Sequence, residues 1–185
     1  MKANSKLISY LQKHPKIYFA YGSNLNLTQM KVRCPDSKLI KICTLEDYKL
    51  VFRGVADVEY SKGDKVWGAL FRVGYKDIVN LDAYEGYPNL YTKEYMPTKY
   101  GHGFFYIMNN QHDVKPPSEY YYDTIKKGYK QCKLPSVKPL TLSLRQSKKH
   151  RNTDEVDCGS KWGIKTRKKY FVNEYGQYIM DDTNE

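Results

Sequence analysis

Runs of hydrophobic residues along the chain predict short strands that pack into one domain. Residues 17–21 form a continuous apolar and aromatic run, which predicts a buried strand that ends at Gly22. Residues 65–73 carry apolar side chains on both faces, which is typical of a strand inside a sheet. Further strands are expected within residues 38–60, where the pattern fits two or three, and at residues 91–98 and 103–108.

A second set of segments shows the spacing of helices. Ile78, Leu81 and Glu85 lie at i, i+3 and i+7, which places them on one helical face. Gly86 directly follows and suits the C-terminal end of that helix, and Ser118 suits the N-cap of a later one. Helices are expected at residues 25–33, 75–85 and about 118–132.

The order of these elements indicates an α+β fold class with one main domain over residues 16–135. Residues 1–15 are polar and are assigned to an N-terminal arm. The character of the chain changes after Pro135, because residues 136–185 are polar and basic with few periodic apolar positions. They are assigned to a C-terminal extension of unknown role, in which residues 168–180 resemble a β-hairpin.

Charge and composition narrow the classes of function. The 185 residues carry a net charge of +11, which attracts polyanions. The lysines are spread along the chain without a nucleic-acid-binding motif, so nucleic acid is not favoured as a partner. No run approaches the ~20 apolar residues of a membrane span, so no membrane association and a cytoplasmic location are expected. The sequence leaves a homodimer open.

The metal-ligating residue types show no pattern of a metal site. Cys34, Cys43, Cys132 and Cys158 include no C-x-x-C pair, and the four histidines lie far apart along the chain. No metal site is expected, and each cysteine is interpreted as a small apolar residue or a free thiol.

The first candidate for chemistry is the turn Gly22-Ser23-Asn24, which follows the strand at residues 17–21. A strand that breaks at a glycine and enters a helix leaves backbone N–H groups without partners, and these favour a carboxylate or an oxyanion. Ser23 and Asn24 are suitable cap residues that also donate to a ligand. A capped turn without any ligand fits Tyr21-Gly22-Ser23-Asn24 equally well.

The second candidate is Glu85, at the expected end of the helix at residues 75–85. The negative end of the helix dipole and an apolar face both disfavour its ionised carboxylate. A carboxyl group that is close to neutral suits general acid–base catalysis. A surface glutamate near a helix end is the alternative, and Asp82 is a rival carboxylate that looks more solvated.

Six segments in order resemble the γ-glutamylcyclotransferase family, which also contains the cyclotransferase of butirosin biosynthesis and plant avirulence-induced relatives. The order of the segments makes the resemblance specific, although each is short, and together they cover about residues 16–135. The matching segments are residues 18–25 (YFAYGSNL), 54–58 (GVADV), 66–71 (VWGALF), 81–86 (LDAYEG), 106–108 (YIM) and 117–135, which contains Tyr121 and Gly128.

The resemblance implies a small mixed β-barrel flanked by helices and a reaction without any cofactor. The substrate would be a γ-glutamyl amide, whose own α-amine attacks the γ-carbonyl to release 5-oxoproline and an amine or amino acid. Glu85 would be the catalytic residue that moves protons, and Asn24 points to the γ-glutamylcyclotransferase branch. The residues expected to contact substrate are Tyr18, Phe19, Ala20, Tyr21, Gly22, Ser23, Asn24 and Tyr121.

Two alternatives stay open from the sequence. One is a deprotecting cyclotransferase that acts on a γ-glutamylated intermediate of a dedicated pathway. The other is a non-catalytic binding module whose basic tail binds a polyanion. The chain departs from the family pattern in three ways that keep these alternatives open. Residues 136–185 have no counterpart in the family, the charge is unusually basic, and residues 87–90 after Glu85 need not match any particular substrate loop.

Overall fold

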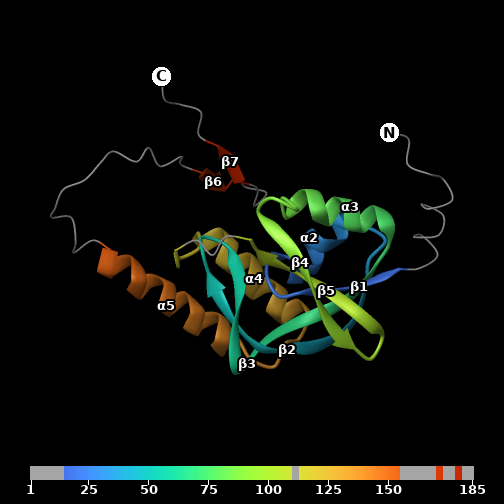
Figure 1. The fold of residues 1–185 in the computed structure, drawn as a ribbon, viewed down its shortest axis with the longest axis horizontal. Coiled ribbons are helices and arrows are strands. Elements are labelled where there is room, and N and C mark those ends of the chain that lie inside the picture. The colour runs from blue at the N-terminus through green and yellow to red at the C-terminus, as the bar shows by residue number, and fades with distance from the viewer. Residues whose placement is uncertain (1–14, 110–112, 155–169, 173–177, 181–185) are drawn as a thin grey trace.

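The computed structural model describes residues 15–109, 113–154, 170–172 and 178–180, and one curled five-stranded sheet organises them (Figure 1). The sheet has the order β2-β3-β1-β5-β4. Because β1 is antiparallel to β3 and parallel to β5, the sheet is mixed, as expected. The strands are β1 (Lys16–Ala20), β2 (Lys38–Phe52), β3 (Ala56–Val73), β4 (Tyr91–Thr98) and β5 (Gly101–Met108).

The sheet curls until its two edge strands meet, which gives the expected barrel-like shape. A long hairpin of β2 and β3 supplies one side, and β-bulges at Leu39/Lys41 and Glu46/Tyr48 bend it. Where the two edge strands approach each other, the Tyr48 hydroxyl of β2 donates to Glu94 of β4 over 2.8 Å. This contact joins the first and last strands of the sheet order.

The strand expected at residues 65–73 begins earlier than predicted, at Ala56, so the prediction of a separate strand was wrong. That segment is the second half of β3, and the polar residues before it continue the same strand, with Tyr60 opposite Tyr48 and Lys65 opposite Glu46. The polar residues 61–64 lie in the middle of β3, at the irregularity where the register shifts between Glu46 and Tyr48, so the loss of hydrophobic residues marked a bulge and not a break between two strands. The expected place of residues 65–73 inside the sheet, between β1 and β2, is confirmed.

Strand β1 runs through the core, and β3 accommodates it closely. Four of its five residues are buried, and Phe19 and Ala20 have no exposed surface. A Cβ atom at Gly68 of β3 would lie only 2.4 Å from the Ala20 carbonyl oxygen and from the Phe19 ring. Gly68 therefore allows the close packing that fixes the end of β1, where the chain turns at Gly22.

The turn after β1 forms a short 3-10 helix, η1 (Ser23–Leu25), followed by α2 (Leu27–Arg33). The expected helix at residues 25–33 is therefore present as α2 with a start two residues later, and Leu25 belongs to η1. The cap of α2 is Asn26, whose side chain accepts from the N–H groups of Thr28 and Gln29. Ser23 and Asn24, which were expected to cap, lie one turn earlier with their side chains bonded elsewhere.

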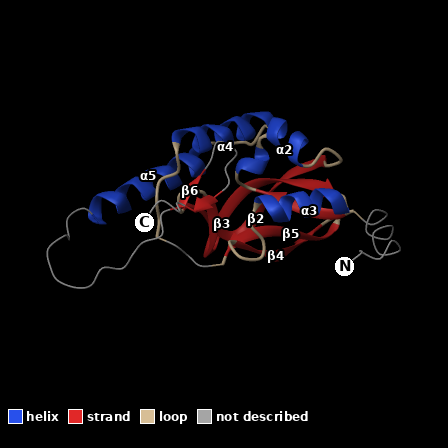
Figure 2. Ribbon diagram, turned by 90° about the horizontal axis from the view of Figure 1, so that it is seen from above, coloured by secondary structure: helices blue, strands red, loops and turns tan. Residues whose placement is uncertain are grey.

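Two longer helices, which Figure 2 shows with the sheet, supply residues that contact the turn. Helix α3 (Tyr75–Tyr84) ends at Glu85 and Gly86, whose φ of 62° confirms its expected place after the helix. Helix α4 (Glu119–Gln131) begins at Ser118, whose hydroxyl accepts from the Tyr121 N–H over 3.2 Å, as the sequence predicts.

A helix that the sequence pattern did not predict follows α4. Helix α5 (Lys138–Asp154) packs on β2 through the fully buried Leu140, and Ser143 donates to the Leu50 carbonyl oxygen over 2.6 Å. Its serines made the buried face look polar in the sequence. The division of the chain at residue 135 stays a prediction, but Leu140 ties the start of the proposed extension to the barrel.

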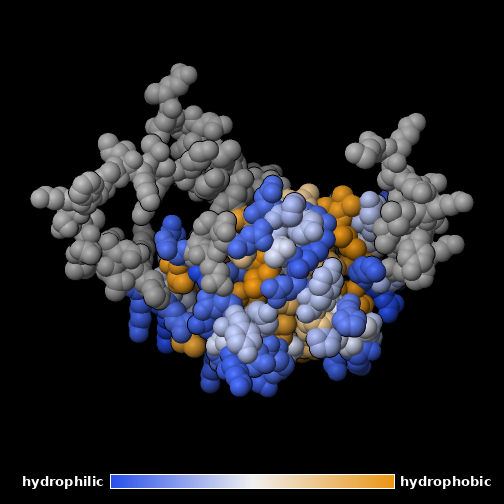
Figure 3. Space-filling model, viewed as in Figure 1, coloured by the Kyte–Doolittle hydropathy of each residue, from blue (hydrophilic) through white to orange (hydrophobic). Residues whose placement is uncertain are grey.

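The expected hairpin within residues 168–180 is present as β6 (Tyr170–Val172) paired antiparallel with β7 (Tyr178–Met180). The expected arm falls almost entirely on residues 1–14, which lie outside the described residues. The face in Figure 3 is largely hydrophilic, with smaller hydrophobic areas between. None of the described helices combines the length and apolar character that a membrane crossing requires.

Gly128→Ala tests how tightly α4 packs on the turn. A Cβ there would lie 2.5 Å from the Leu25 carbonyl carbon and 2.7 Å from the Asn26 nitrogen, both of them backbone atoms. Helix propensity favours alanine by about 1 kcal/mol, whereas overpacking against backbone costs about 1–3 kcal/mol or more. We expect a net loss of about 1–2 kcal/mol in the free energy of unfolding measured in urea. Lys127→Ala at the adjacent exposed position is the control, and a Gly128→Ala protein more stable than wild type would contradict the packing.

Candidate active site

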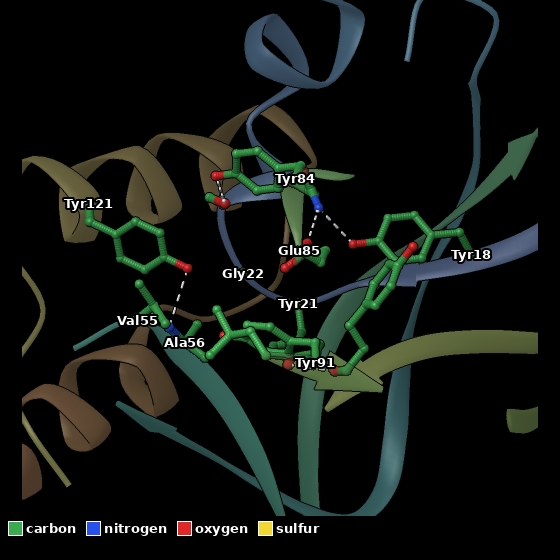
Figure 4. A pocket seen from close by; sticks show the side chains of 13 residues that line it. Tyr18, Tyr21, Gly22, Val55, Ala56, Tyr84, Glu85, Tyr91 and Tyr121 are labelled. Atoms are coloured by element: carbon green, nitrogen blue, oxygen red, sulfur yellow. Dashed lines mark hydrogen bonds between the residues drawn. The ribbon is translucent and has the colours of Figure 1, made fainter. Parts of the chain in front are cut away.

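One pocket collects residues from the turn, the end of α3 and the curled sheet (Figure 4). The empty space within it, including the part open to solvent, is about 480 Å³. Tyrosine is the commonest residue type in its lining, which contains a single carboxylate. The lining residues are Tyr18, Tyr21, Gly22, Ser23, Asn24, Val55, Ala56, Tyr84, Glu85, Leu90, Tyr91, Tyr106 and Tyr121.

The structure brings the two sequence candidates, the turn and Glu85, into direct contact. Asn24 Nδ2 donates to Glu85 Oε1 over 2.8 Å, although 61 residues separate them in the sequence. The same Nδ2 donates to Tyr18 Oη over 2.8 Å. Because Glu85 follows the last residue of α3 and Asn24 lies in η1, this amide joins a helix end to a turn.

The pKa of the Glu85 carboxyl group is raised toward neutral pH. Glu85 as a residue is only half-buried, but its carboxyl group lies inside the pocket. There, loss of water raises its pKa from 4.5 to about 7. The positive charge of Arg33 and the hydrogen bond from Asn24 oppose this rise, while the negative charge of Asp82 adds to it. A carboxyl group with a pKa near 7 both accepts and donates a proton at neutral pH.

The side chains of Arg33 and Tyr84 stack on each other, and both contact the turn. The Arg33 guanidinium carbon lies 3.3 Å from the centroid of the Tyr84 ring, and an Arg33 N–H donates to Asn24 Oδ1. The Tyr84 hydroxyl lies 3.0 Å from Ser23 Oγ. The turn is therefore fixed through the side chains of both Ser23 and Asn24.

In three of the lining tyrosines, the hydroxyl group donates to another atom of the protein. Tyr21 donates to the Tyr106 carbonyl oxygen over 2.7 Å, Tyr91 donates to the Ala56 carbonyl oxygen over 2.8 Å, and Tyr106 donates to Asp82 Oδ1 over 2.6 Å. Burial raises the pKa of all three phenols, so they stay neutral. These three side chains form walls of the pocket, and their hydroxyl hydrogens are already used in hydrogen bonds within the protein.

Tyr18 and Tyr121 are different, because their oxygens act as acceptors. Tyr18 Oη accepts from Asn24, and Tyr121 Oη accepts from the Ala56 N–H over 3.2 Å. Each phenol is thus oriented while it keeps its own O–H hydrogen as a donor. A Cβ at Gly22 would lie 3.2 Å from Ala56 Cβ and 3.5 Å from Tyr121 Oη, so a larger residue there would narrow the pocket.

Not every residue singled out from the sequence lines the pocket. Phe19 and Ala20 lie in the core between Tyr18 and Tyr21 and are absent from the lining. Asp82 lies outside the lining as well, paired with Lys93 over 2.6 Å at a more open position than Glu85. Among the described residues, no group of three or more His, Cys, Asp or Glu side chains is arranged to hold a metal ion.

Sequence reasoning missed several lining residues. Ala56 and Tyr106 lie in segments that carried the family resemblance, and Tyr84 precedes Glu85, so a signal existed for each. Leu90 and Tyr91 had no such signal, because the curl of the sheet alone brings them to the pocket.

Comparison with known proteins agrees with this geometry. The family model described as Gamma-glutamyl cyclotransferase, AIG2-like, matches residues 18–126, which are more than half of the chain and include the turn, Glu85 and Tyr121. The chain belongs to this family.

Relatives of the family support an enzyme of the cyclotransferase type. The chain is 31% identical to the Gamma-glutamylcyclotransferase of Mus musculus and 30% identical to that of Homo sapiens, each over 137 residues, 64% of this chain and 72% of the relative. A solved structure named Gamma-glutamyl cyclotransferase aligns with a TM-score of 0.58 at 27% identity, covering 75% of this chain and 87% of that one. A crystal structure of a Homo sapiens protein described as uncharacterized aligns with the same score at 28% identity, covering 74% of this chain and 86% of that one.

Glu85→Gln measures the cost of keeping this carboxyl group in the pocket. The folded pKa of about 7 lies above the ordinary 4.5, so folding disfavours the ionised form. Below pH 4.5 the carboxyl group is protonated in both the folded and the unfolded protein, so the raised pKa costs no stability. Above pH 7 it lowers the free energy of unfolding by an amount on the order of 3 kcal/mol. We therefore expect Glu85→Gln to gain stability relative to wild type as the pH rises from 4.5 to 7, measured as free energies of unfolding in urea. A constant difference between the two proteins across this range would contradict the raised pKa.

Proposed function

We propose that this cyclotransferase acts on γ-glutamyl amides of small amines or amino acids and releases 5-oxoproline. The observation that carries the proposal is the contact between Glu85 and the turn inside a tyrosine-lined pocket. A carboxyl group with a pKa of about 7 stands next to donors for a polar substrate. The names of the relatives support the same class of reaction.

In the proposed reaction, the substrate supplies its own nucleophile. The α-amine attacks the γ-carbonyl carbon, a C–N bond closes the five-membered ring, and the bond to the leaving nitrogen breaks. Glu85 takes a proton from the substrate amine as it attacks and returns that proton to the leaving nitrogen. No proton is gained or lost by the protein over the cycle, which is why one carboxyl group suffices.

The turn and the two available phenols would hold the substrate in reach of Glu85. Tyr18 and Tyr121 have O–H donors that their own acceptor bonds orient. The first N–H groups of η1, at Gly22 and Ser23, are of the kind that a helix leaves without intrahelical partners. These donors suit the α-carboxylate and the negative charge that develops on the γ-carbonyl oxygen.

Holding the amine against the carbonyl accounts for much of the proposed catalysis. The apolar and phenolic walls, including Val55, Leu90 and Tyr91, surround the ligand and limit its hydration. The chemistry therefore depends on two features: a pocket shape that folds the substrate toward a ring, and a carboxyl group that exchanges protons near pH 7.

A substrate panel tests this function directly. It should contain γ-glutamyl amino acids, γ-glutamyl amines and glutathione, with release of 5-oxoproline as the readout.

Glu85→Gln should lower kcat by about 10²–10⁴-fold without loss of the fold. Asp82→Asn, which removes a carboxylate one turn earlier on α3, should stay within about tenfold of wild type. Near wild-type turnover by Glu85→Gln would exclude the proposed role. A rate only on one elaborate γ-glutamylated intermediate would favour a deprotecting enzyme.

The roles of the tyrosines can be separated by removing single hydroxyl groups. Tyr121→Phe removes an available donor, and we expect kcat to fall about 10–100-fold. Tyr91→Phe removes a hydroxyl that donates to the Ala56 carbonyl oxygen, so its main effect should be on stability, about 1 kcal/mol. Steady-state kinetics and urea unfolding of both variants provide the comparison. A larger loss of kcat in Tyr91→Phe than in Tyr121→Phe would contradict the assignment of donors.

A further inference from the structure

Arg33 lies outside the pocket lining, yet it contacts the residue that bonds Glu85. Its guanidinium group has only N–H donors, and one of them meets Asn24 Oδ1. Its flat face covers the Tyr84 ring at 3.3 Å. Among the described residues, no carboxylate forms an ion pair with Arg33, so its charge is not neutralised by a direct partner within that part of the chain.

This contact decides which way the Asn24 amide faces. An amide has one acceptor oxygen and one nitrogen with two donors. Because Arg33 offers only donors, the oxygen of Asn24 must face Arg33, and both N–H donors then point to Tyr18 Oη and Glu85 Oε1. Asn24 is only 2% exposed, so water does not substitute freely for these partners.

We infer that Arg33 is a positioning residue that orients the Asn24 amide, so that Glu85 Oε1 is a fixed acceptor and Glu85 Oε2 carries the mobile proton. The carbonyl oxygen of a protonated carboxyl group accepts an N–H bond better than its hydroxyl oxygen does, so the bond from Asn24 to Oε1 favours the proton on Oε2. The proton exchange proposed for Glu85 would therefore run through Oε2. The inference rests on the proposed function for its catalytic consequence, but not for the geometry.

The charge of Arg33 has a second effect on the same carboxyl group. The charged groups that act on Glu85 are Arg33 from α2 and Asp82 from α3, and Lys93 of β4 pairs with Asp82. The phenols near enough to interact electrostatically with Glu85 are neutral because burial raises their pKa values. These are Tyr18, Tyr21, Tyr84, Tyr91, Tyr106 and Tyr121. Removing the Arg33 charge should therefore raise the pKa of Glu85 further.

The test uses the full chain with Arg33→Met, Arg33→Lys and the control Lys31→Met. Lys31 is exposed on the same helix, so its loss changes the net charge equally without touching Asn24. The Glu85 carboxyl carbon is followed by ¹³C NMR of glutamate-labelled protein, with Glu85→Gln to assign the signal. This titration does not require that any substrate be turned over.

We expect the Glu85 midpoint to rise by about one pH unit in Arg33→Met, and to stay near wild type in Lys31→Met. Arg33→Lys keeps the charge, so its midpoint should lie between the two. At pH 7, a midpoint one unit higher lowers the ionised fraction about fivefold. The value of kcat/KM for 5-oxoproline release should fall by a similar factor and recover at higher pH.

Equal midpoints in Arg33→Met, Lys31→Met and wild type would overturn the inference, whatever the activity. If Arg33→Met does not fold, Arg33→Lys decides. Lysine lacks the planar guanidinium group that stacks on Tyr84 and bonds Asn24, so an unchanged rate and pH profile in Arg33→Lys would also overturn the inference. A wild-type protein that releases no 5-oxoproline from any substrate would instead contradict the proposed function. The shifted midpoint in Arg33→Met would still show the effect of the Arg33 charge on Glu85, and a midpoint in Arg33→Lys above that of wild type would support the positioning role, because lysine keeps the charge.

Discussion

The amide of Asn24 is the interaction on which the rest of the site depends. It connects three elements at once: Tyr18 in β1, Glu85 at the end of α3 and Arg33 in α2. All of its donors and its acceptor oxygen are used, so its orientation is determined by its neighbours. An amide in this position supports the carboxyl group of Glu85 without adding a charge. An acidic side chain would repel the carboxylate, and a basic one would keep it ionised at all working pH values.

The surrounding fold brings this amide to its place by close backbone packing. Gly68 lets β3 approach the end of β1, and Gly128 lets α4 approach η1, in both cases at distances that a Cβ would not permit. The curl of the sheet then brings β4 and its Tyr91 to the side of the pocket opposite the turn. The site is therefore formed where a strand, a helix end and a glycine-packed helix meet, and its walls follow from the barrel-like curvature.

Much of this arrangement could be predicted from the sequence, but not its connections. The strand before Gly22, the helix before Gly86 and the pairing of the turn with Glu85 followed from local patterns and from the ordered family segments. The continuity of β3 did not, because its exposed middle has no hydrophobic signal. Helix α5 was also missed, since Ser143 and Ser147 make its buried face look polar. Arg33 had no signal either, because its proposed role depends on a contact between the end of α2 and Asn24 in η1, nine residues earlier.

The pH dependence of kcat/KM for 5-oxoproline release tests the central claim, that Glu85 exchanges protons near neutrality, most directly. With a γ-glutamyl amide as substrate, we predict a rise in kcat/KM through an apparent pKa near 7, the value that burial gives the Glu85 carboxyl group. The residual activity of Glu85→Gln should lack this step. A profile that is flat through pH 7, or that rises only near the ordinary glutamate pKa of 4.5, would contradict it.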